Sequence, residues 1–117
     1  MDLGLEIDDS GKAPVVVVRG EVDFGSAPRL RELLVKRAME GAQHVVVDLS
    51  GVEFLDSTGL GVLVGAVKRY RTLGGDLYMV ITTERIRAVF ELTGLTSAFT
   101  LYDDRASAVA EAAAATP

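Results

Sequence analysis

The chain has 117 residues, 49% hydrophobic and 25% charged, without cysteine; this predicts one globular domain over residues 1–117 and excludes disulfides and thiolate metal sites. Its formal charge of −5, from 12 basic and 17 acidic residues, argues against direct nucleic-acid binding, because that requires a basic face. No apolar run approaches the ~20 residues that span a bilayer, and the acidic N-terminus lacks a signal-peptide layout, so we expect a cytoplasmic protein without a membrane partner.

The chain alternates between strand and helix patterns after an opening hairpin. Leu3, Leu5 and Ile7 alternate with polar residues, as in a half-buried strand, and a turn cluster then leads into the apolar run Val15–Val18. We expect strands over residues 3–7, 15–18, 44–49, 77–81 and 99–101, and helices over about 27–40, 57–73, 84–93 and 105–114. This order predicts an α/β fold with a mixed β-sheet (an N-terminal hairpin plus parallel crossovers) covered by about four helices.

Polar residues mark where the helices begin. Ser26 is expected to cap the first helix, with Pro28 in the first turn, where its missing N–H costs little. Thr83 is expected to cap the third helix, and Asp103 or Asp104 the last.

The most informative stretch is Val45–Gly61, VVVDLSGVEFLDSTGLG. It predicts a buried strand, a short turn, and the hydroxyl pair Ser57 and Thr58 where a helix begins. A phosphate on a serine there would be held by free backbone N–H groups and would change the local charge sharply. The plainer alternative is an ordinary N-cap, formed by one of the hydroxyls or by Asp56.

Two glycines inside that helix require an explanation, because each costs about 1 kcal/mol relative to alanine. Gly61 and Gly65 fall beside Lys68, away from the apolar face that includes Leu60. Either they pack closely against another element of the same domain, or they leave a thin outer face that lets a partner approach the backbone. The sequence alone leaves both alternatives open.

No residue pattern supports catalysis. His44 is the only histidine, it precedes a strand, and no nucleophile elbow is present. The glycines match neither a phosphate-binding loop nor a dinucleotide fingerprint. We therefore expect a structural role for His44, and we expect no catalytic residue, no metal and no cofactor.

Three blocks of sequence, taken in order, match the pattern of one known family. The first is GEVD at Gly20–Asp23 followed by APRL at Ala27–Leu30. The second is DLSGVEFLDSTGLG at Asp48–Gly61, which keeps a D-S-S/T-G-L-G signature without departure. The third is FELTGL at Phe90–Leu95, with Phe99 after it. Over nearly the whole chain the sequence resembles the STAS domain family, and most closely its bacterial anti-sigma factor antagonists.

The resemblance implies a switch of partners controlled by phosphorylation. In such proteins the unphosphorylated form binds an anti-sigma factor with serine-kinase activity and frees the sigma factor. Ser57 matches the serine that the kinase phosphorylates, Thr58 is a candidate secondary acceptor, and a metal-dependent serine phosphatase resets the switch. By the same match, Glu21 and Asp23 would lie near Ser57 and touch the kinase. The residues expected to contact the partner are Glu21, Asp23, Asp56, Ser57, Thr58, Gly59, Leu60 and Gly61.

Two other functions stay open for the same fold. One is a STAS scaffold subunit of a larger signalling assembly, which would associate with copies of itself or with relatives. The other is a nucleotide- or lipid-binding STAS module, because anions favour the start of a helix. The short, free-standing length favours the anti-sigma factor antagonist over the scaffold.

Overall fold

The chain opens with an antiparallel hairpin, as its alternating apolar pattern predicts. The structure is a computed structural model, and it describes residues 2–117. In chain order the elements are β1 (Gly4–Asp8), β2 (Val15–Val22), α1 (Ala27–Met39), β3 (His44–Leu55), α2 (Ser57–Thr72), β4 (Asp76–Val80), α3 (Glu84–Leu92), the short 3₁₀ helix η1 (Thr96–Ala98), β5 (Thr100–Tyr102) and α4 (Arg105–Ala115).

The strands form one mixed sheet in the order β1-β2-β3-β4-β5. β1 pairs antiparallel with β2, whereas the β2–β3, β3–β4 and β4–β5 pairs are parallel. Parallel neighbours need crossover connections, which α1, α2 and α3 with η1 supply in turn. The predicted α/β fold, with its hairpin, parallel crossovers and four helices, is confirmed.

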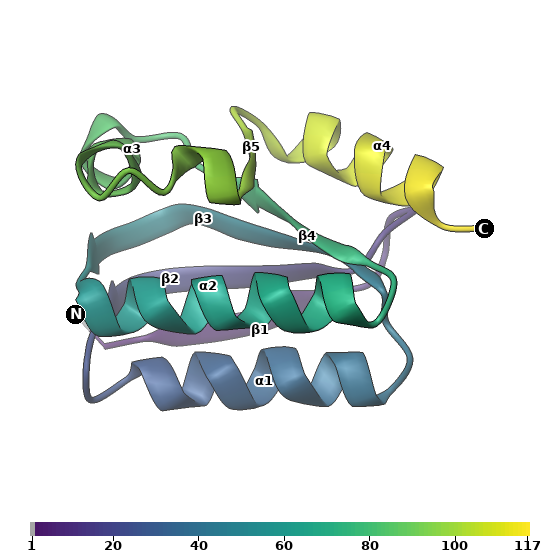
Figure 1. The fold of residues 1–117 in the computed structure, drawn as a ribbon, viewed down its shortest axis with the longest axis horizontal. Helices are drawn as coiled ribbons and strands as arrows, with labels where there is room; N and C mark the ends of the chain where they lie inside the picture. Colours follow the sequence, from purple (N-terminus) through teal and green to yellow (C-terminus); the bar gives the residue numbers. More distant parts are fainter. Residues whose placement is uncertain (1) are drawn as a thin grey trace.

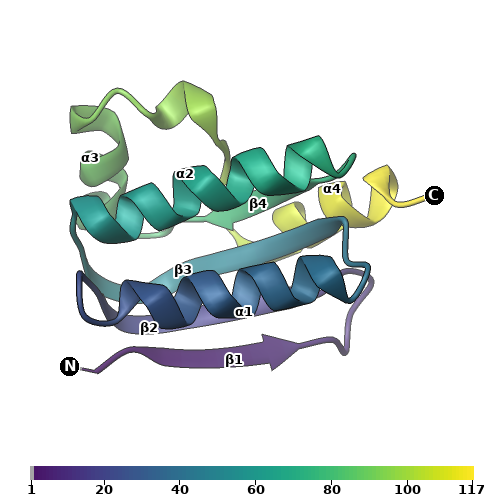
Figure 2. The same cartoon turned by 60° about the horizontal axis from the view of Figure 1, so that its bottom comes forward.

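Helices cover both faces of the sheet (Figure 1). On one face α1 and α2 lie side by side (Figure 2), and α3 adds Ile86 and Phe90 to the same core. On the opposite face α4 packs Ala108 and Ala112 against a smaller core. Because side chains alternate along a strand, β3 supplies residues such as Val46 to the smaller core and its neighbours to the larger one.

β3 is longer than the sequence predicted. The predicted short turn after residue 49 is wrong, because the strand continues to Leu55 and leaves only Asp56 before α2. After a shift in register, Gly51 pairs with Arg19, and Val22 pairs with Leu55, so β2 is also longer than predicted. A Cβ atom on Gly51 would lie 2.8 Å from the Cγ of Arg19. This glycine therefore makes room for the neighbouring strand and does not form a turn.

Two of the predicted helix caps are confirmed and one works differently. Thr83 and Asp104 accept hydrogen bonds from the N–H of the third residue of α3 and α4, at 3.4 and 2.7 Å. Ser26 occupies the N-cap position of α1, but its side chain makes no cap hydrogen bond. Its hydroxyl turns back and donates to the Glu21 carbonyl at 2.8 Å. The carbonyl of Asp23 accepts the first N–H of α1 instead, at 2.8 Å.

Candidate functional site at the start of helix α2

Ser57 is the first residue of α2 and is exposed to solvent. Asp56 caps the helix, since its Oδ1 accepts from the Gly59 N–H at 2.9 Å. The N–H groups of a first helical turn have no intrahelical acceptor, so the positive end of the α2 dipole faces the surroundings of Ser57. Within residues 2–117 the Ser57 hydroxyl makes no hydrogen bond. Asp56 therefore takes the capping role and leaves the Ser57 oxygen available.

Asp56 also fixes the loop between β2 and α1 against the start of α2. Its Oδ2 accepts from the Phe24 N–H at 3.1 Å, and its own N–H donates to the Val22 carbonyl at 3.1 Å. Since Asp23 lies between these two contacts in the chain, the structure brings Asp23, Asp56 and Ser57 to the same end of the sheet.

Asp23 organises this loop. Its Oδ1 accepts from the N–H groups of Gly25 and Ser26, each at 3.0 Å, and lies 3.1 Å from the Ser26 hydroxyl. The backbone hydrogen bond from Ser26, followed by the one from its hydroxyl, holds the pKa of Asp23 below its ordinary value. Asp23 therefore serves as a turn-forming acid, and with Glu21 and Arg29 it lines a surface hollow of about 470 Å³.

Two of the expected contact residues are buried beneath this surface. Leu60 is 4% exposed and belongs to the main core. Gly59 is also buried, and a Cβ atom there would lie 2.7 Å from both Leu55 Cδ1 and Val22 Cγ1. Gly59 thus lets α2 begin tightly against the ends of β2 and β3. These two residues support the site from below.

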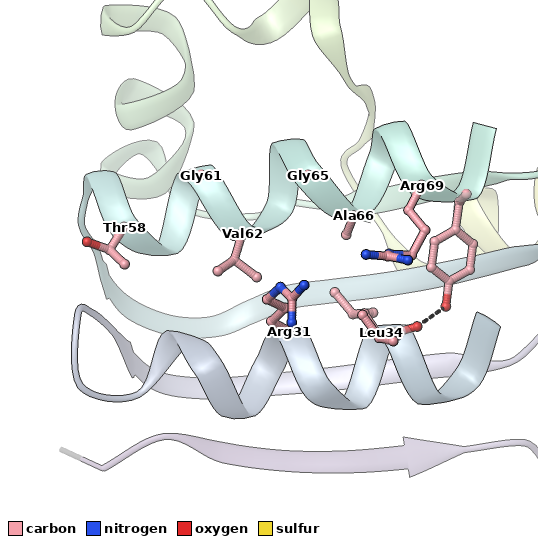
Figure 3. A pocket seen from close by; sticks show the side chains of 10 residues that line it. Arg31, Leu34, Thr58, Gly61, Val62, Gly65, Ala66 and Arg69 are labelled. Carbon is pink, nitrogen blue, oxygen red and sulfur yellow. Dashed lines mark hydrogen bonds between the residues drawn. The ribbon is translucent and has the colours of Figure 1, made fainter. Parts of the chain in front are cut away.

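The glycines further along α2 border a groove between α1 and α2 (Figure 3). A Cβ atom on Gly61 or Gly65 would meet nothing within 4 Å, so these glycines do not pack closely against another element of the domain. Of the two alternatives, this leaves an outer surface of α2 without side chains, where a partner could approach the helix backbone. The groove has a volume of about 350 Å³, and half-buried Thr58 lies on its rim. Its lining includes Tyr70, whose hydroxyl donates to the Leu34 carbonyl at 2.6 Å. Burial, only partly opposed by a nearby arginine, raises the pKa of Tyr70 to about 12.

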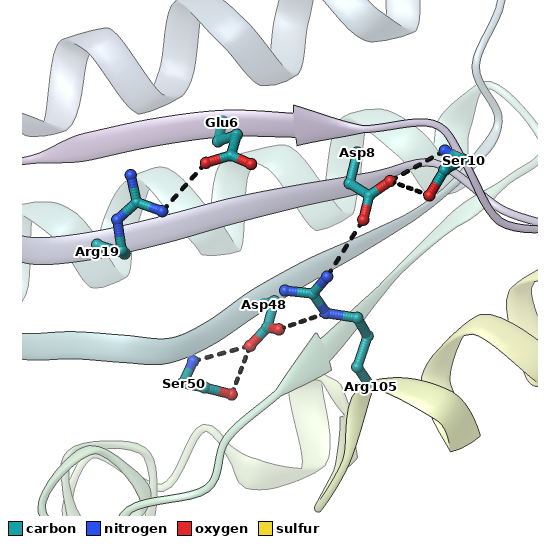
Figure 4. A network of polar contacts seen from close by, with 7 residues as sticks. All are labelled: Glu6, Asp8, Ser10, Arg19, Asp48, Ser50 and Arg105. Atoms are coloured by element: carbon teal, nitrogen blue, oxygen red, sulfur yellow. Dashed lines mark hydrogen bonds and ion pairs between the residues drawn. The ribbon is translucent and has the colours of Figure 1, made fainter.

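A separate polar cluster lies on the other face of the sheet (Figure 4). Arg105, at the start of α4, donates from Nε to Asp48 at 2.8 Å and pairs through Nη1 with Asp8 at 3.4 Å. The hydroxyl and N–H of Ser50 donate to the other oxygen of Asp48 at 2.5 and 2.9 Å. Burial alone would raise the pKa of Asp48, but the Ser50 hydrogen bonds and Arg105 outweigh it and lower that pKa. The cluster therefore joins α4 to the sheet.

The sequence model of the STAS domain matches residues 5–108. The chain belongs to the STAS domain family. A Staphylococcus aureus protein named anti-sigma-B factor antagonist is 37% identical over 95 residues, which cover 81% of this chain and 88% of that protein. The Staphylococcus epidermidis protein of the same name is 39% identical over the same coverage. The crystal structure of an anti-sigma factor antagonist from Mycobacterium paratuberculosis has 30% identity and a TM-score of 0.86, over 95% of this chain and 94% of that one.

This STAS domain also carries two exposed aromatic side chains that the sequence analysis missed. Phe24 is 80% exposed and Phe54 is 49% exposed. Phe24 follows Asp23 and donates its N–H to Asp56, while Phe54 pairs in register with Glu21. Both aromatics therefore lie at the same end of the sheet as the start of α2. An aromatic residue inside the polar loop D-F-G-S was the signal that could have identified Phe24.

Residues 2–117 of this STAS domain also show how the structure bears on metal binding, on membrane-spanning helices and on His44. No group of three or more histidine, aspartate or glutamate side chains in this range could hold a metal ion. None of the helices in the same range is both long and apolar enough to cross a bilayer. His44 lies half-buried at the start of β3, with its Nδ1 2.8 Å from the Tyr78 hydroxyl, which agrees with the structural role expected for it.

Proposed function

We propose that this chain is an anti-sigma factor antagonist whose unphosphorylated form binds an anti-sigma factor with serine-kinase activity and releases the sigma factor. Phosphorylation of Ser57 switches this binding off, and a metal-dependent serine phosphatase restores it. The observation that carries the proposal is the exposed Ser57 hydroxyl, free of hydrogen bonds within residues 2–117, at the start of α2. The names of the relatives at 37–39% identity support the same role.

The charge around Ser57 explains how a phosphate would act. A phosphoserine carries about −1.5 to −2 charges at pH 7. Both oxygens of Asp56 already accept backbone hydrogen bonds, and within the described chain Asp56 has no ion-pair partner. The phosphate would therefore add its charge beside an uncompensated carboxylate. A coupling of about 2–3 kcal/mol would weaken a partner's affinity by tens to a hundredfold, without refolding.

The docking surface that we propose surrounds this hydroxyl. It comprises Ser57, Thr58 and Gly61 from α2, Asp23 from the β2–α1 loop, and the exposed ring of Phe24. Aromatic side chains are frequent anchors in the centres of interfaces, and an aromatic that is 80% exposed has no packing role in its own domain. A partner that covers Phe24 would also cover the start of α2, because Asp56 ties the two together.

The test compares substitutions of two serines that each lie in the first turn of an Asp-capped helix. Ser57→Ala should retain the kinase-type anti-sigma factor from the source cells and abolish phosphate uptake with ATP. Ser57→Asp should weaken binding by about tenfold or more. Ser107→Asp, in the first turn of α4, provides the matched control and should leave binding unchanged. Mass spectrometry of the wild-type chain that finds phosphate but none at Ser57, or equal weakening by both Asp variants, would contradict the proposal.

A further inference from the structure

Basic residues are concentrated in α1 and α2, whereas most acidic residues lie elsewhere in the chain. α1 and α2 together hold seven of the 12 basic residues and one of the 17 acidic residues. The basic residues are Arg29, Arg31, Lys36, Arg37, Lys68, Arg69 and Arg71, and the acidic residue is Glu32. The layer formed by these two helices is therefore strongly positive, although the chain as a whole has a formal charge of −5.

The groove between α1 and α2 concentrates part of this charge. Arg31 from α1 and Arg69 from α2 both line it, and their guanidinium groups extend into the space between the two helices (Figure 3). Within residues 2–117 neither guanidinium makes a hydrogen bond or an ion pair. Arg37 and Arg71, in contrast, are paired with Asp9 and Asp76. The groove thus presents two unneutralised cations on a chain whose formal charge is −5.

We propose that this groove is a docking site for an acidic helix of a partner protein. A third helix can pack into the groove between two helices that lie side by side, as α1 and α2 do. The open space above Gly61 and Gly65 lets the backbone of such a helix approach α2 closely. Carboxylates spaced one turn apart on the incoming helix would reach Arg31 from one side and Arg69 from the other, as charge-assisted hydrogen bonds. The volume of about 350 Å³ accommodates a few side chains, with the helix itself lying above.

The chemistry of the groove favours a protein over an anionic membrane surface. A helix layer that binds a bilayer presents a band of large apolar side chains between its basic residues. On α1 and α2 the large exposed apolar residues are Met39, at the end of α1, and Leu73, directly after α2. The exposed residues that line the groove are arginines and glycines, whereas its apolar lining residues are buried or half-buried: Leu34, Val35, Val62, Ala66 and Tyr70. A concave, charged surface without such a band suits a complementary acidic segment.

The test does not depend on phosphorylation of Ser57, because it uses the unmodified full chain and a synthetic probe. The probe is a fluorescent alanine-based helix with glutamates at i and i+4, and its control is the same peptide with glutamine. The wild-type chain should bind the glutamate peptide in fluorescence anisotropy and bind the glutamine peptide at least about tenfold more weakly. The Arg31→Gln/Arg69→Gln double variant should lose about tenfold in affinity.

Two further variants separate the groove from overall charge. Lys12→Gln/Arg85→Gln changes the net charge equally, at exposed residues outside the groove, and should alter affinity by less than about twofold. Gly61→Leu should fill the groove without a change in charge, and should also weaken binding. Equal losses in the two double variants would overturn the proposal. So would a chain that ignores the peptide but sediments with phosphatidylglycerol vesicles through Arg31 and Arg69, which would assign the face to a membrane.

Discussion

Asp56 is the side chain on which the geometry around Ser57 depends. One of its oxygens accepts from Gly59 in α2, and the other accepts from Phe24 in the preceding loop. We expect Asp56→Ala to lower the free energy of unfolding by about 2 kcal/mol, because it removes both a helix cap and a tie between two segments. Asp56→Asn, which retains one acceptor, should cost less. Urea denaturation followed by circular dichroism measures both.

Asp104→Ala is the matched control for this prediction, since Asp104 caps α4 and its carboxylate accepts only from Ser107. It should cost about 1 kcal/mol. A loss from Asp56→Ala that is no larger than the loss from Asp104→Ala would show that the tie to Phe24 adds nothing to stability.

The two glycines that flank Leu60 should respond in opposite directions to the same substitution. Gly61→Ala should stabilise the domain by up to about 1 kcal/mol, because alanine favours a helix and the added methyl meets open space. Gly59→Ala should destabilise it by about 1–3 kcal/mol, because the methyl would overlap Leu55 and Val22. Thermal unfolding of the two variants measures the difference. A gain in stability from Gly59→Ala would contradict the close packing at the start of α2.

At the scale of residues, the sequence predicted the start of α2 better than the contacts around it. The helix start at Ser57, with Asp56 as one candidate cap, followed from local residue preferences. The inward role of Gly59 did not, because it depends on Val22, which a register shift in the sheet brings close. Phe24 was missed because a lone aromatic residue in a loop carries no periodic signal.

Among the elements, α4 is joined to the sheet by the polar contacts of one residue, Arg105. It packs through small alanines, and its first residue, Arg105, reaches Asp48 in β3 and Asp8 in β1. We expect Arg105→Met to lower the free energy of unfolding by about 1–3 kcal/mol, because it leaves the 5%-exposed Asp48 without its cation. Hydrogen exchange should show the amides of α4 opening before those of α2.

Arg87→Met is the control for α4. Arg87 forms its ion pair with Asp103, whose side chain is 87% exposed, so the loss should stay below about 1 kcal/mol. If both arginine variants lose the same stability, or if α4 exchanges no faster in Arg105→Met, the anchoring role of Arg105 is wrong.

Element order was predictable and strand length was not. Alternating apolar runs and helical spacing gave the hairpin, the crossovers and the four helices, because each element signals its type locally. The end of β3 was misplaced because serine and glycine usually mark a turn. Here Gly51 instead accommodates Arg19 of the neighbouring strand, and that requirement exists only once β2 and β3 are paired.

Over the whole molecule, carboxylates with lowered pKa values link stability to pH. Hydrogen bonds lower the pKa of Asp8, Asp23 and Asp104, mainly through neighbouring serines. The pKa of Asp48 is also lowered, because its hydrogen bonds and Arg105 outweigh the effect of burial. A carboxylate whose pKa is lower in the folded than in the unfolded chain stabilises the fold above the unfolded pKa of about 3.9. That contribution is lost as the pH falls through the folded value.

The free energy of unfolding should therefore be flat from about pH 7 to 5 and should fall most steeply below about pH 4, between the unfolded pKa and the lower folded values. Asp48→Asn retains one acceptor oxygen, for Ser50 or for Arg105 but not for both, and removes the ionisation. The variant should therefore start less stable at pH 7 and lose less on acidification. Glu91→Gln, on the exposed side of α3 and without an ion pair in the described chain, provides the control and should retain the wild-type slope. Urea denaturation at several pH values measures these slopes.

Because Asp8 and Asp48 share Arg105, acid should release α4 from the sheet before the other helices. If Asp48→Asn keeps the wild-type slope, the acid sensitivity lies in the other carboxylates.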